Sequence, residues 1–173
     1  DGLNYASGAA DSSSHLAADL FKSMASVKIV RVPYRGGGPA VLALVGGQVQ
    51  LMFGTANSVQ PHITSGRLRP LAVTSARRST VAPELPTMAE AGLKGYETVT
   101  AYALFAPAGI PAAIVGRLNS EIVQVLKQNE VKERFLAAGV EVVGSLPSEL
   151  TAVMKADVAR MSKIIKSTGM RAE

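Results

Sequence analysis

The chain has no cysteine among its 173 residues. Disulfide bonds, thiolate nucleophiles and cysteine-ligated metal sites are therefore excluded within it. The cellular compartment stays open, because proteins of oxidising compartments can also lack cysteine. Hydrophobic residues make up 47% of the chain and charged residues 18%, which is typical of a globular domain and not of a disordered segment.

Long apolar runs and clusters of charge are also lacking. The apolar run 40–45 is far shorter than the roughly 18 residues that cross a bilayer. Residues 1–10 lack the basic start and apolar stretch of a signal peptide, so we expect none in this chain. The formal charge is +5, but Lys and Arg are scattered and the few aromatic residues do not alternate with them. We therefore expect a solvated, mildly basic surface and no nucleic-acid partner.

Motifs for catalysis and for cofactor binding are scarce. HExxH and GxSxG are absent, and neither His15 nor His62 has a carboxylate at a spacing that marks a metal site. Residues 36–38 lack the Lys and Ser/Thr of a P-loop, and residues 8–10 lack the GxGxxG spacing. We therefore expect no enzyme activity, no metal and no cofactor.

The first part of the chain contains an alternation of strand and helix patterns. The predicted strands are 3–7, 28–33, 49–53 and 68–74. The predicted helices are 11–25, 39–45 and 57–65. This alternation predicts an α/β fold with a mainly parallel sheet and crossover helices.

The second part is predicted to be more helical. Its predicted elements are a helical turn at 86–91, a strand at 98–106, helices at 111–128 and 130–138, a strand at 140–143 and a helix at 147–168. Apolar residues follow one face of the helix 111–128 at helical spacing.

Three predicted loops lie outside the carboxyl ends of strands, where α/β sheets bind ligands. These loops are 7–14, 34–38 and 54–58, and they are rich in small and polar residues. In the first, "GAADSSSHLAADLF" places serines 12–14 at a helix start. Either these hydroxyls only cap the helix, or the helix amides also receive an anion, for which Asp11 would compete.

Four longer runs resemble a single protein family in order and spacing. They are "LNYASGAADSSSHLAADLF" (3–21), "VPYRGGGPAVLALVGGQVQLMFG" (32–54), "GRLRPLAVTSARRSTVAPELPTMAEAG" (66–92) and "APAGIPAAIVGRLNSEI" (106–122). The chain resembles the Bug family, the substrate-binding proteins of tripartite tricarboxylate transporters.

The resemblance implies a fold and a function. It implies a two-lobed fold like that of type II periplasmic binding proteins, located in the periplasm. It implies a receptor that binds a small carboxylate and delivers it to membrane permease subunits, with no cofactor and no metal.

The chain also departs from the family pattern. Family members are nearly twice as long, and the amino-terminal segment of the first lobe, with its ligand loops, has no counterpart here. The resemblance therefore implies a second lobe at 1–98 with 146–173, and a crossover segment at 99–145 that belongs to an incomplete first lobe. Tyr102 stands where the family commonly has Trp, and Gly54-Thr55 stands where many members have an Asp beside the Asn.

Two further expectations follow from the missing segment. Its absence would expose the apolar faces of residues 101–144, so we expect a homo-oligomer formed through them. An alternative function is that of an interaction or sensing module without a complete ligand cleft.

The resemblance also implies ten ligand-binding residues, which fall in the three loops already identified. They are Ser7, Gly8, Ala9, Ser12, Tyr34, Gly36, Gly37, Thr55, Asn57 and Ser58. Each has a simpler structural interpretation, such as a core position for Tyr34, a helix cap for Asn57 or a turn at Gly36. Arg35, the basic residue in these loops, is expected to steer an anion and not to hold it.

Overall fold

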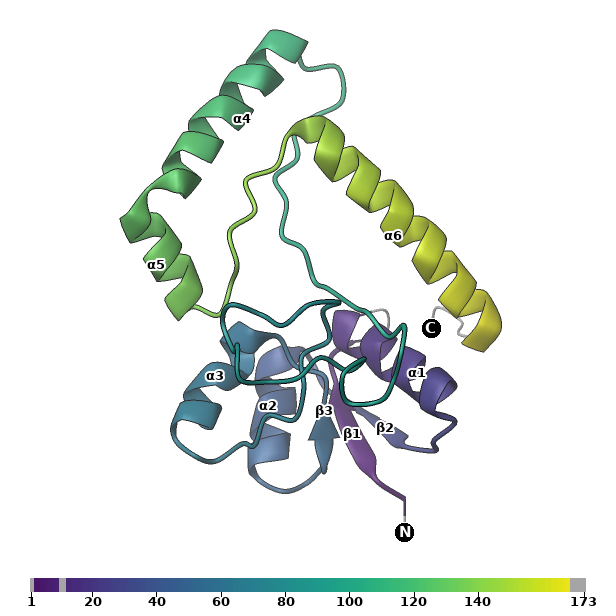
Figure 1. Ribbon diagram of the computed structural model, residues 1–173. Helices are drawn as coiled ribbons and strands as arrows, with labels where there is room; N and C mark the ends of the chain where they lie inside the picture. The colour runs from purple at the N-terminus through teal and green to yellow at the C-terminus, as the bar shows by residue number, and fades with distance from the viewer. Residues whose placement is uncertain (1, 10–11, 169–173) are drawn as a thin grey trace.

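The computed structural model describes residues 2–9 and 12–168 (Figure 1). Ala10 and Asp11, from the first predicted loop, lie outside the described residues, as do Asp1 and residues 169–173, from the predicted second lobe. The strands are β1 (Asn4–Ser7), β2 (Val30–Pro33) and β3 (Leu51–Met52). The helices are α1 (Ser13–Ala25), α2 (Gly37–Val45), α3 (Ala56–Thr64), α4 (Ala112–Lys127), α5 (Asn129–Ala137) and α6 (Pro147–Thr168).

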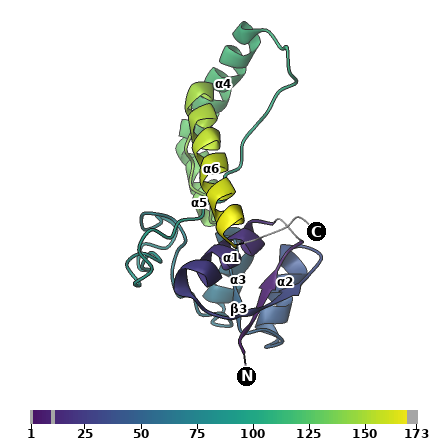
Figure 2. The same cartoon turned by 90° about the vertical axis from the view of Figure 1, so that its right-hand side faces the viewer.

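The molecule has two visibly different parts. The described residues up to 98 form the sheet body, in which α1, α2 and α3 surround a small sheet (Figure 1). Residues 99–168 form the helical arm, in which α4, α5 and α6 outline a triangle around two extended segments (Figure 1). Figure 2 shows that the arm is thin when viewed edge-on, so its three helices lie close to one plane above the body.

The sheet is parallel, with strand order β2-β1-β3. Tyr5 of β1 pairs with Arg31 on one side and Leu51 on the other. The α/β class with parallel strands is therefore confirmed. Because all three strands run the same way, the loops that follow them emerge at one edge of the sheet.

The body is held together by apolar side chains on both faces of β1. Adjacent residues of a strand point to opposite faces, so Ala6 packs on α2 while Tyr5 packs on α1. On the α2 face the buried contacts are mostly alanines, which let helix and sheet approach closely. On the α1 side a further cluster joins Leu20 and Tyr96 to Met161 of α6.

Helix boundaries follow from their caps. The α1 helix begins after Ser12, whose Oγ accepts a hydrogen bond from the His15 N–H at 3.4 Å. It ends at Ser26, which takes the left-handed conformation (φ 53°) and donates its N–H to the Lys22 carbonyl. The six predicted helices lie within two residues of the observed ends.

Three predicted strands were wrong. Of 68–74, only Val73 forms a bridge, with Thr87, and in the described residues 98–106 and 140–143 form no strand. A strand needs a neighbour for its backbone groups, and in the described structure no strand lies beside either arm segment. Tyr102 and Leu104 would share one face of a strand, and both side chains are left uncovered here, at 72% and 75% exposed. The third observed strand is also shorter than the predicted 49–53.

The arm buries little of its apolar surface. Neither α4 nor α5 has a buried residue. None of the described helices has the length and apolar character that a membrane span requires.

Candidate functional site

The three predicted ligand loops do meet at one edge of the body. Ser7 pairs with Pro33, and Ala6 pairs with Met52, so the residues after each strand emerge side by side. A backbone hydrogen bond of 2.9 Å from Tyr34 N to the Ser7 carbonyl ties the first loop to the second. All ten predicted residues lie in the described part of the chain.

The first loop begins with a buried turn at Ser7 and Gly8. Ser7 is fully buried, and its Oγ donates to the Gly8 carbonyl at 3.1 Å. The same Oγ accepts from Arg31 Nε at 2.8 Å, and Arg31 Nη2 donates to the Gly8 carbonyl at 3.3 Å. The hydroxyl of Ser7 is therefore engaged within the protein. Arg31 was not predicted as a site residue, because the sequence alone marks it only as one residue of the strand predicted at 28–33.

The serines at the start of α1 hold the other side of this turn. Gly8 N–H donates to Ser14 Oγ at 3.1 Å, and the hydroxyls of Ser12 and Ser14 are 3.0 Å apart. Ser12 also caps the helix, so the capping interpretation is confirmed for this residue. A Cβ at position 8 would lie 3.3 Å from Ser12 Oγ, which leaves little room for a larger residue.

The second loop combines a core residue with an open turn. Tyr34 is partly buried and packs against the alanine cluster under α2, as its core interpretation predicts. Gly36 has φ 104°, a conformation that favours glycine, and Gly37 begins α2. Gly37 and Arg35 are exposed beside it.

The third loop begins α3. Thr55 is the N-cap of the helix, and Thr55 Oγ1 donates to Ser58 Oγ at 3.2 Å. Ser58 Oγ donates in turn to the Thr55 carbonyl at 2.8 Å. The cap interpretation of Asn57 was wrong, because Asn57 lies one residue inside the helix with its side chain exposed.

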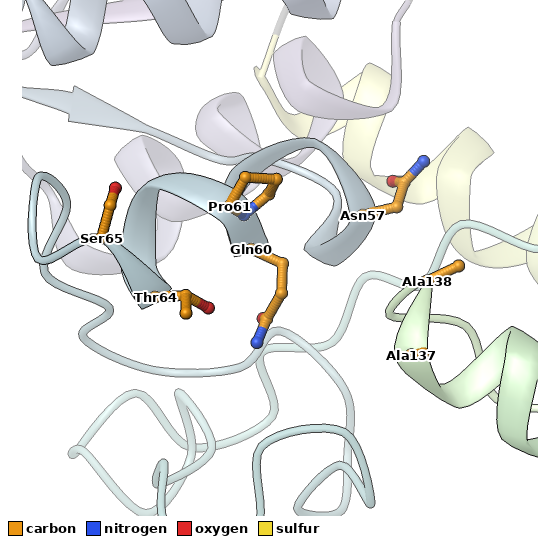
Figure 3. Close-up of a pocket in the computed structure, with 7 residues that line it drawn as sticks. All are labelled: Asn57, Gln60, Pro61, Thr64, Ser65, Ala137 and Ala138. Atoms are coloured by element: carbon orange, nitrogen blue, oxygen red, sulfur yellow. The ribbon is translucent and has the colours of Figure 1, made fainter.

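A shallow cavity of about 530 Å³ lies between α3 and the end of α5 (Figure 3). Its lining residues are Asn57, Gln60, Pro61, Thr64, Ser65, Ala137 and Ala138. Asn57 is the one predicted ligand residue among them, so this hollow is not formed by the three loops together.

Ionisable groups lie beside the site. His15 Nε2 is 3.2 Å from Asp19 Oδ2, and Asp19 Oδ1 also accepts from Lys22 Nζ at 3.1 Å. Burial, with the nearby Asp19 carboxylate, raises the pKa of Tyr5 above its usual range. Across residues 2–9 and 12–168, no cluster of three or more His, Asp or Glu side chains is placed to hold a metal ion.

Comparison with known proteins gives a consistent picture. Residues 1–170 match the family model of the tripartite tricarboxylate transporter family receptor. The chain is 40% identical over 164 residues to the UPF0065 protein in the tcbD-tcbE intergenic region of Pseudomonas sp. (strain P51), covering 94% of this chain and 49% of that protein. It is 35% identical over 167 residues to protein BugT of Bordetella pertussis, covering 96% of this chain and 51% of BugT.

Solved structures agree in fold over nearly the whole chain. Rpa4515 of R. palustris with adipate has a TM-score of 0.88 and 36% identity, with coverage of 96% of this chain and 56% of Rpa4515. The periplasmic binding protein BugD has a TM-score of 0.85 and 31% identity, with coverage of 99% and 58%. MatC of Rhodopseudomonas palustris with bound malate has a TM-score of 0.83 and 31% identity, with coverage of 94% and 56%.

The chain spans about half the length of the curated relatives it matches. The match nevertheless runs through both the sheet body and the helical arm, and the fold agrees throughout. The chain therefore belongs to the tripartite tricarboxylate transporter receptor family.

Proposed function

We propose that this chain is the carboxylate-binding part of a periplasmic receptor for a tripartite tricarboxylate-type transporter. The observation that carries the proposal is the likeness to Rpa4515 and MatC, whose structures hold adipate and malate. The ligand would be a small carboxylate, and the partner that receives it would be the membrane permease. Residues 1–98 with 146–173 would form the second lobe, and 99–145 would belong to the first.

The edge where the three loops meet suits an anion. The N-termini of α1 and α3 both begin there, and unpaired amides at a helix start attract negative charge. Small residues let a ligand approach the backbone closely. Among the ten candidates, Ala9, Gly37 and Asn57 are exposed and available for direct contact, whereas the buried Ser7 and Gly8 would support the loop.

Calorimetric titration of the purified chain with adipate, malate and a monocarboxylate tests this proposal. We expect saturable binding to one site and weaker binding after Gly8→Val, because a larger residue would press on Ser12. Arg35→Ala should slow association more than it speeds dissociation. The absence of saturable heat with every carboxylate would contradict the proposal.

A second candidate function, as an interaction module, is favoured by the exposed apolar residues of the arm. Tyr102, Leu104 and Phe105 are each more than 70% exposed, and exposed apolar patches commonly bind partners. Self-association through residues 101–144 is the form of this candidate to test. Light scattering at low micromolar concentration should then give the mass of a dimer or larger species, and a monomeric mass would contradict it.

A further inference from the structure

Arg31 is a basic residue at the candidate site that lies outside the ten residues predicted from the sequence. It belongs to β2, at the edge of the sheet, and pairs with Tyr5 of the central strand. Its side chain reaches past the end of β1 to the buried turn. Nε donates to Ser7 Oγ at 2.8 Å and Nη2 donates to the Gly8 carbonyl at 3.3 Å.

These contacts close a ring of hydrogen bonds. The Ser7 hydroxyl accepts from Arg31 and donates to the Gly8 carbonyl, which also accepts from Arg31. On the opposite side, the Gly8 N–H donates to Ser14 Oγ. The carbonyl of Gly8 is thus held from the sheet, and its N–H is held from α1.

The direction of the Gly8 carbonyl matters for an anion site. A carbonyl oxygen is an acceptor and carries partial negative charge, so a carboxylate next to it would be repelled. Glycine has no Cβ and reaches conformations closed to other residues, so its peptide groups need outside contacts to stay in one orientation. Arg31 supplies those contacts and keeps this oxygen turned toward the protein.

We propose that Arg31 is a positioning residue that preorganises the Ser7–Gly8 turn for carboxylate binding. The proposal rests on the carboxylate-receptor function proposed above. Because the loop is fixed before the ligand arrives, less conformational freedom is lost on binding. Arg31 acts through the loop and need not touch the ligand.

The chain offers matched variants to test this role. Arg31→Met keeps much of the side-chain length but removes the hydrogen bonds. Arg31→Lys keeps a flexible donor that can restore one of them. Arg35→Met is the control, because it removes an exposed basic residue four positions after Arg31. Thermal unfolding of each variant establishes that it is folded.

The first measurement needs no ligand. Amide hydrogen exchange at Gly8 is recorded by NMR for all four proteins, together with the ¹⁵N chemical shift of Ala9, whose nitrogen shares a peptide group with the Gly8 carbonyl. We expect exchange at Gly8 to rise about tenfold in Arg31→Met, to lie between Arg31→Met and wild type in Arg31→Lys, and to stay unchanged in Arg35→Met. Unchanged exchange at Gly8 together with an unchanged Ala9 shift in folded Arg31→Met or Arg31→Lys would overturn the proposal.

The second measurement is titration with adipate. We expect the dissociation constant to rise roughly tenfold in Arg31→Met, with partial recovery in Arg31→Lys and less than threefold change in Arg35→Met. Equal adipate affinity in wild type and Arg31→Met would overturn the proposal. If no carboxylate binds the wild-type chain, the receptor function fails, and the exchange at Gly8 still decides whether Arg31 positions the turn.

Discussion

The sheet body and the helical arm use similar residues in opposite ways. In the body, apolar side chains such as Tyr5, Val41 and Val49 are almost fully buried. In the arm, Ile114, Leu118 and Val125 follow one face of α4 yet each remains nearly half exposed. An amphipathic pattern therefore predicts a helix reliably, but whether its apolar face is covered depends on what lies beside it.

Two joints connect the arm to the body. At one, Gly139 after α5 lies against the first turn of α3, and Glu141 accepts from Ser79 Oγ at 2.6 Å and Thr80 N at 2.7 Å. At the other, Arg160 of α6 pairs with Glu97 at 3.1 Å. These joints allow the comparison of the two parts to be tested by substitution.

The largest effect is expected from a matched pair of tyrosines. Tyr96 is 1% exposed, and its hydroxyl donates to the Ala17 carbonyl at 2.8 Å. Burial raises its pKa to about 12. Tyr96→Ala should lower the free energy of unfolding by about 3–5 kcal/mol, because it leaves a cavity and an unpaired carbonyl. Tyr102→Ala, in the arm, should change it by less than about 0.5 kcal/mol. Urea unfolding monitored by circular dichroism measures the free energy of unfolding of both variants. Equal losses in the two variants would contradict the expected difference between body and arm.

A second pair of variants tests the joint at α3. A Cβ at position 139 would lie 2.9 Å from Asn57 N, and Gly139 has φ 74°. Gly139→Val should therefore cost roughly 1–3 kcal/mol in strain and loosen the arm as well. Gly109→Val is the control, because Gly109 has φ 85° but no neighbour within 4 Å of its Cβ position. Limited proteolysis should cut residues 99–146 faster in Gly139→Val than in Gly109→Val. Equal cleavage rates would show that the contact of Gly139 with α3 does not hold the arm against the body.

The smallest effect concerns the pH dependence of the same joint. Hydrogen bonds from Ser79 and then from the Thr80 amide lower the pKa of Glu141. A lowered pKa stabilises the folded state above the ordinary carboxyl value of 4.5, and this contribution is lost as the pH falls through the folded pKa. Because Glu141 is exposed, the contribution should be at most about 1 kcal/mol.

Glu141→Gln checks this assignment. In wild type the arm should become more sensitive to protease as the pH falls below 4.5, whereas in Glu141→Gln this dependence should weaken. Glu90 in the body, whose pKa is lowered mainly by the Thr87 amide, provides the control through Glu90→Gln. If the protease sensitivity of the arm depends on pH as strongly in Glu141→Gln as in wild type, a group other than Glu141 causes that dependence.

Local patterns were sufficient to predict the helices and the three parallel strands of the body, although the body strand predicted at 68–74 was wrong. The three loops were also predicted at the right edge, because the carboxyl ends of parallel strands lie at one edge of a sheet. The strand predictions at 98–106 and 140–143 failed, because apolar alternation describes a segment and not its neighbours. Arg31 was missed for a related reason, since its contacts with Ser7 and Gly8 join residues more than twenty positions apart.

The contact between Arg160 and the Glu97 carbonyl joins residues 63 positions apart and closes a loop that contains α4, α5, both extended segments and the first part of α6. The entropy cost of closing a loop grows only with the logarithm of its length, by roughly 0.6 kcal/mol for each doubling. Segments away from Gly139 and Glu141 could therefore be inserted into or removed from this loop at little thermodynamic cost to the body. The folding rate of the sheet body should also be independent of the length of this loop. The β1–β2 and β1–β3 pairings involve only residues that precede the loop, so they can form before α6 docks.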